Sequence, residues 1–177
     1  MQPTDITPLP TAFRRIGWSN LFAQFSEQIA LAAAPLAAVL LLAAGPAETG
    51  WLQTAQTLPF LLLSIPAGLM VDRASRRRLM VGTEVLRAVS LLAIPLLLAA
   101  GSLNLSWLAL LGALGAIGTV CYSVAAPAFV PSVVPRERLA DANRWLELAR
   151  SAAYAGGPAL GGALVGWIGV STAYGLA

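Results

Sequence analysis

The chain has 177 residues, of which 58% are hydrophobic and 11% charged, whereas soluble domains carry about 25% charged residues. Its net charge is +3, and every basic residue is an arginine because the sequence contains no lysine or histidine. Water is therefore not its main solvent, and histidine-based catalysis and histidine-ligated metal are excluded. Cys121 is the sole cysteine, which excludes an internal disulfide, a cysteine zinc site and a CxxC redox pair.

Five apolar runs follow one another along the chain. Each has about 20 residues or more, the length that a helix needs to cross a bilayer. Loops rich in glycine, proline or arginine separate them, and the last eight residues have the pattern of a new helix. The sequence thus predicts an all-α integral membrane protein with five transmembrane helices plus the start of a sixth, and a chain that stops inside an element. The predicted ranges are residues 16–44, 51–71, 79–100, 105–126, 145–168 and 170–177.

The arginines indicate how the chain is oriented. They lie before the first predicted helix, after the second and after the fourth, and the other two loops contain no basic residue. If the helices alternate in direction, all three basic segments lie on one side, which is the cytoplasmic side for short arginine-rich loops. Residues 1–15 are therefore predicted to form a cytoplasmic tail. Arginines spread in this way offer no continuous basic face, so nucleic-acid binding is not expected.

The first predicted helix carries polar residues where lipid is expected. Glu27 lies near its middle, where a charged group costs on the order of 2.5–3.5 kcal/mol. Asn20 and Gln24 share its face because they are spaced at three and four residues. This face is predicted to belong to a substrate or proton pathway, the alternative being hydrogen bonds between helices. A weaker polar stripe of the second helix either faces the same cavity or holds the first helix; it contains Gln53, Gln56, Thr57 and Ser64.

Later helices offer weaker signals. Glu84 and Arg87 are three residues apart and are predicted to pair on the surface of the third helix in a structural role. Glycines in the fourth and fifth helices predict close helix packing, which small residues allow in lipid. Tyr122 and Tyr154 place hydroxyl groups near these contacts, where they serve either a bound ligand or the helix pairs.

The segment after the second helix resembles the signature between helices two and three of the Major Facilitator Superfamily, usually Gly-x-Leu-Ala-Asp-Arg-x-Gly-Arg-Arg. Ser75 stands where the family has its second glycine. The resemblance implies a charge cluster that latches one conformation of the cytoplasmic face, the alternative being arginines that only set topology. The residues that match are Gly68, Asp72, Arg73, Arg76 and Arg77.

Residues 153–162 look like the helix-five signature of antiporters in this superfamily, Gly-x-x-x-Gly-Pro-x-x-Gly-Gly, with Ala153 in place of the first glycine. The matching residues are Gly157, Pro158, Gly161 and Gly162. Residues 134–143 are similar to the loop before helix five in the branch with macrolide-efflux and enterobactin-exporter-like proteins. Both segments favour export. The arginine that many proton-coupled antiporters carry in helix four has no counterpart in residues 105–126, so proton coupling through Glu27 is a hypothesis.

The resemblance implies a secondary transporter of the bacterial inner membrane that expels a small amphipathic molecule in exchange for protons by alternating access. Its partners would be lipid, substrate and protons, with no cofactor. The family has twelve helices in two halves, so residues 16–177 are expected to form an incomplete N-terminal six-helix bundle that lacks its C-terminal half and is inactive alone. The alternatives are an importer of a small solute and a non-transporting membrane scaffold. A membrane enzyme is not expected, since the sequence has no HExxH, paired aspartates or Ser/His arrangement.

Overall fold

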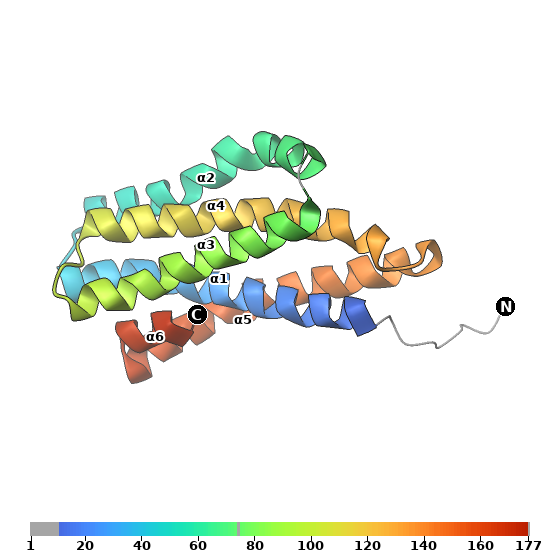
Figure 1. Ribbon diagram of the computed structural model, residues 1–177. Helices are drawn as coiled ribbons and strands as arrows, with labels where there is room; N and C mark the ends of the chain where they lie inside the picture. The colour runs from blue at the N-terminus through green and yellow to red at the C-terminus, as the bar shows by residue number, and fades with distance from the viewer. Residues whose placement is uncertain (1–10, 74, 177) are drawn as a thin grey trace.

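The computed structural model describes residues 11–73 and 75–176, with the side chains of all these residues except 11, 12 and 72. This part of the chain contains helices and no strand, which confirms the predicted all-α class (Figure 1). Five long helices are followed by a short one, with two 3₁₀ turns before the fifth. The elements are α1 (Thr11–Leu42), α2 (Pro46–Arg73), α3 (Arg76–Ala99), α4 (Leu105–Phe129), η1 (Val130–Ser132), η2 (Arg136–Arg138), α5 (Leu139–Ile168) and α6 (Val170–Leu176).

Four helices begin earlier than predicted, α2 at Pro46 and α3 at Arg76 among them. Helix α1 starts at Thr11, so Arg14 and Arg15 are exposed residues of its first turns, while residues 1–10 of the predicted tail lie outside the described residues. Helix α5 starts at Leu139, where the Arg138 side chain pairs with Asp141 at 2.8 Å across the first turn. Charged residues form helix ends readily, so apolar runs alone place these ends too far inside.

Side chains and glycines mark several helix ends. The hydroxyl of Ser75 accepts a hydrogen bond from the backbone N–H of Arg78 at the start of α3, and Asn104 caps Trp107 in the same way at the start of α4. Serine and asparagine are preferred at this position because they satisfy donors that the first turn leaves free. Gly101 and Gly169 follow α3 and α5 with positive φ angles of 66° and 81°, a conformation that favours glycine.

The helices pack in two groups. Helix α4 lies between α2 and α3, whereas α1 packs chiefly against α5, and α6 touches α1, α3 and α5 (Figure 1). The N-terminal ends of α1, α3 and α5 and the C-terminal ends of α2 and α4 lie at the same end of the bundle (Figure 1). The three arginine segments therefore gather at this end, as predicted, and we call it the arginine end. The loops without basic residues lie at the other end.

Helix α3 is built inside out compared with a helix of a water-soluble protein. It buries Thr83, Arg87 and Ser90, and it exposes apolar side chains spaced at three and four residues, namely Val81, Val85, Val89, Leu92 and Leu96. An apolar exterior with a polar interior fits a surrounding of lipid. Helices α1 to α4 are each long and apolar enough to cross a membrane, so the chain is a multi-pass membrane protein. Helix α5 differs from these four helices because its first half carries four charged residues, Asp141, Arg144, Glu147 and Arg150.

Candidate functional site

The polar face of α1 is turned into the bundle. Glu27 is 8% exposed and Asn20 4%, and Gln24 beside them is half-buried. Gln28, next to Glu27, is also buried and packs against α5. A carboxyl group held between helices needs compensation from neighbouring polar groups, because the cost of burying it is otherwise high.

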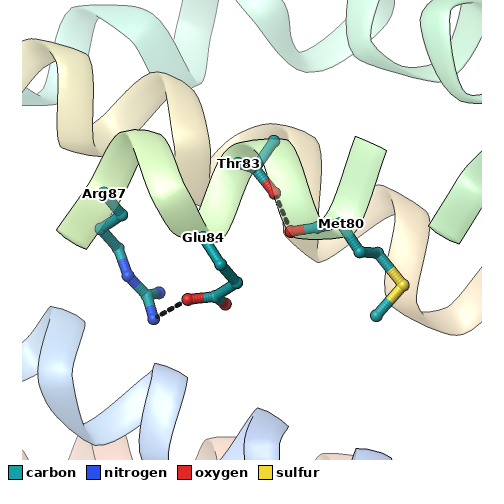
Figure 2. Close-up of polar contacts among 4 residues, drawn as sticks. All are labelled: Met80, Thr83, Glu84 and Arg87. Carbon is teal, nitrogen blue, oxygen red and sulfur yellow. Dashed lines mark hydrogen bonds and ion pairs between the residues drawn. The ribbon is translucent and has the colours of Figure 1, made fainter. Parts of the chain in front are cut away.

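The compensating charges come from α3. Arg87 pairs with Glu84 over 2.8 Å between Nη2 and Oε2, as the three-residue spacing predicted. Figure 2 shows both side chains on one face of α3, close to Thr83, whose hydroxyl donates to the carbonyl of Met80. The pair was predicted on the helix surface, but Arg87 is only 8% exposed. Which face of a helix meets its neighbours depends on tertiary packing, so the spacing alone does not reveal this interior position.

Glu27 and Arg87 line the same small pocket, of about 40 Å³, between α1, α2, α3, α4 and α6. Gln56 of α2 reaches this pocket because Gly112 of α4 leaves room for its side chain, and its Oε1 has no hydrogen-bond partner. The pocket thus combines a carboxyl, a guanidinium and a free amide oxygen in a space that suits about one water molecule.

Two wider cavities reach Glu84, the partner of Arg87. One, of about 490 Å³ between α1, α3 and α6, is lined by Ser19, Glu84 and Arg87. The other, of about 570 Å³, lies between α1, α3 and α4 toward the arginine end and is lined by Arg15, Arg77, Glu84 and Tyr122 among others. The hydroxyl of Tyr122 is buried there without a hydrogen-bond partner. Glu84 therefore lines both cavities.

The predicted pathway residues fall into two groups. Asn20, Glu27 and Tyr122, from α1 and α4, are buried in the bundle, and Gln24 of α1 is half-buried. Gln53 and Tyr154 are exposed on α2 and α5, and Tyr154 is 57% exposed. Within the polar stripe of α2 it is Gln56, 2% exposed, that joins Glu27. Gln56 belongs to the stripe that was predicted to face the cavity or hold α1. The only signal for Arg87 in the sequence is its spacing from Glu84, which predicted a structural role.

The motif between α2 and α3 lies at the arginine end. Arg73, Arg76 and Arg77 are exposed, and Gly68 in α2 has open space where a side chain would project. Arg76 donates a hydrogen bond of 2.7 Å to the carbonyl of Ala128 in α4. Ser75, in place of the family glycine, caps α3. The side chain of Asp72 lies outside the described part of the chain, so the predicted charge latch stays a prediction.

The glycine motif of α5 forms the contact with α1. A Cβ on Gly157 would overlap the side chain of Gln28, and one on Gly161 would lie 3.0 Å from both the Ala32 Cβ and the Ile29 carbonyl oxygen. Gly162 and Pro158 face away from this contact: Gly162 has no atom within 4 Å of such a Cβ, and Pro158 is exposed. Two of the four motif residues thus bring the α5 backbone against α1 beside Glu27.

Long apolar helices that enclose charged groups define a helical membrane protein. The sequence model of the transmembrane secretion effector family matches residues 4–177, so the chain belongs to this family of the Major Facilitator Superfamily. The predicted resemblance is thereby confirmed, and the family places the chain among transporters rather than enzymes. The chain is also similar to the multidrug efflux pump Tap of Mycolicibacterium fortuitum, with 32% identity over 120 residues. That match covers 65% of this chain and 29% of the relative.

Proposed function

We propose that the chain is the N-terminal bundle of a proton-coupled exporter that expels small amphipathic molecules by alternating access. The observation that carries this proposal is Glu27, a buried carboxyl group in a pocket that Arg87 also lines. Arg87 in turn lines one of the two wider cavities. The secretion-effector family supports the direction of transport, as does the similarity to a protein named as a multidrug efflux pump.

Glu27 carries the proton in this proposal. A carboxyl group that alternates between its neutral and ionised forms couples proton movement to any rearrangement that changes its surroundings. Asn20, Gln24 and Tyr122 offer hydrogen bonds to a polar group of the substrate, and the apolar walls of the cavities accept its hydrophobic part. Gln53 and Tyr154 lie on exposed faces of α2 and α5. There they contact substrate at the interface with a second bundle.

The second bundle is part of the proposal because the matched segment makes up 29% of the relative, and transporters of this superfamily work as two halves around a central site. All five long helices cross the membrane, including α5, whose second half has no charged residue from Ser151 to Ile168. The arginine end faces the cytoplasm of a bacterial cell, with the N-terminus on the same side.

The arginine end acts as the cytoplasmic latch. Asp72, with Arg73, Arg76 and Arg77, closes the cytoplasmic face in one conformation and releases it in the other. The bond between Arg76 and the carbonyl of Ala128 supports this role, because it ties the motif to the end of α4. The tight contact of Gly157 and Gly161 with α1 keeps α5 and α1 together as one rigid unit during the movement.

The test is efflux of a lipophilic cationic dye from a drug-sensitive bacterium that expresses the complete transporter, measured with and without a proton uncoupler. We expect efflux that the uncoupler abolishes and that Asp72→Asn and Glu27→Gln remove. Glu147→Gln is the matched control, because Glu147 is an exposed residue paired with Arg150 at 2.7 Å. Dye accumulation instead of efflux would favour an importer, and no dye movement from a stably folded protein would favour a membrane scaffold.

A further inference from the structure

Arg87 is placed between two carboxyl groups on different helices. It is bonded to Glu84 one turn away on α3, and it shares the small pocket with Glu27 of α1. Arginine stays protonated at any pH a protein tolerates, so this site holds one fixed positive charge and two groups that can be negative. Helix α4 contains no basic residue, so the positive charge of this site comes from α3.

Two hydrogen-bond acceptors near Arg87 have no partner in this arrangement. Its Nη2 bonds Oε2 of Glu84, while Oε1 of Glu84 is buried without a hydrogen-bond partner. In the pocket, Oε1 of Gln56 is also unpartnered, although a guanidinium carries five N–H donors. A guanidinium that turned into the small pocket would approach two other groups that line it, Gln56 of α2 and Glu27 of α1. The long side chain of arginine allows such a turn without moving the helix backbone.

Resting on the proposed proton-coupled function, we propose that Arg87 is a shared counter-ion, paired with Glu84 while Glu27 is protonated and turning to Glu27 once that carboxyl releases its proton. The step breaks only the bond between hydrogen and oxygen in the Glu27 carboxyl, and the proton passes to water in a cavity. The guanidinium then exchanges one carboxylate for another. Arg87 is a positioning residue here, because it acts through Glu27 and Glu84.

No other charged side chain of the described residues lines the small pocket. Helix α2 contributes Gln56 and Phe60, α4 contributes Thr119, and α6 contributes the titratable Tyr174. Tyr122 of α4 lies in the wider cavity with Glu84, and α5 meets this part of α1 through Gly157. A change in the charge of Glu27 therefore acts first on Arg87.

The experiment measures thermal unfolding of the purified 177-residue chain in detergent at about pH 9, where an ordinary carboxyl group is ionised. The effect of Glu84→Gln is compared in two backgrounds, the native chain and Glu27→Gln. With Glu27 present, Arg87 keeps a partner when Glu84 is neutralised. In the Glu27→Gln background it is left buried and unpaired. We expect the midpoint temperature to fall further in that background, by about 2–4 °C.

Both variants retain Arg87, so loss of the buried guanidinium itself does not contribute to either result. Glu147→Gln serves as the control background, in which the effect of Glu84→Gln should equal that in the native chain. Equal losses in the native and Glu27→Gln backgrounds would overturn the shared counter-ion. The outcome is separate from that of the dye assay: absent efflux with unequal losses would refute only the proposed function, and efflux with equal losses only the role of Arg87.

Discussion

Nη1 of Arg76, the first residue of α3, donates a 2.7 Å hydrogen bond to the carbonyl oxygen of Ala128 in the last turn of α4. Carbonyl groups at the end of a helix have no partner within the helix, so this bond satisfies one of them. It also joins two helix ends that are 52 residues apart in sequence. Arg76 thus links the superfamily motif to the end of α4.

Arg76→Ala should loosen the arginine end of the bundle. A hydrogen bond from a charged group that is exposed contributes about 1 kcal/mol, so we expect the midpoint of thermal unfolding to fall by about 2–4 °C. Tryptophan fluorescence of the purified chain reports the transition. Arg78→Ala is the control, because the backbone of Arg78, and not its side chain, bonds to Ser75. Equal midpoints for the two variants would contradict the structural role of Arg76.

Gly157→Ala should weaken the contact between α1 and α5. The added methyl group overlaps the side chain of Gln28 at its Cβ, which cannot move without the α1 backbone, and overpacking of this kind costs about 1–3 kcal/mol. Gly162→Ala adds the same methyl group into open space and should be neutral or stabilising by up to about 1 kcal/mol through helix propensity. The measurement compares the thermal unfolding midpoints of the two variants. A Gly162→Ala variant as unstable as Gly157→Ala would refute the tight contact.

The proposed orientation predicts which loops a membrane-impermeant thiol reagent reaches in intact cells. Cys121 is buried and can be removed as Cys121→Ala, after which single cysteines are introduced at exposed serines of opposite ends. Ser102→Cys, at the end without arginines, should be labelled from outside, and Ser132→Cys, at the arginine end, only after the cells are permeabilised. The reverse pattern would place the arginine end outside the cell.

Tyr122→Phe should separate stability from transport. The Tyr122 hydroxyl is buried without a hydrogen-bond partner, and such a group costs about 1–3 kcal/mol. Its removal should leave the unfolding midpoint unchanged or raise it, while dye efflux falls if the hydroxyl binds substrate as proposed. Unchanged efflux would remove Tyr122 from the pathway, and a lower midpoint would indicate a bonding partner for its hydroxyl.

Much of the fold follows from the sequence because lipid imposes simple rules on it. The apolar runs predicted the order of the helices, and the arginines predicted which helix ends lie together. Neither pattern depends on how the helices pack. Helix ends were less accurate: the polar residues before Ile16 and Trp145 continue the helices instead of ending them. The capping role of Ser75 was also hidden, because its place in the family motif belongs to glycine.

The candidate site was less predictable, because it depends on which faces of the helices meet. The polar face around Glu27 was found from spacing and its charge cost. The spacing of Glu84 and Arg87 predicted their pairing but not that α3 turns Arg87 inward toward α1. In α2, Gln53 and Gln56 were equivalent as sequence, and packing against Gly112 selects Gln56. Such choices are made by contacts between helices, which a single sequence does not display.

The most direct test of proton coupling uses inside-out vesicles with the complete transporter and an imposed pH gradient, acid inside, in the presence of a lipophilic cationic dye. If Glu27 carries the proton, the gradient drives dye into vesicles with the native protein, Glu27→Gln abolishes this accumulation, and Glu147→Gln retains it. Gradient-driven accumulation that persists in a folded Glu27→Gln variant would contradict the account.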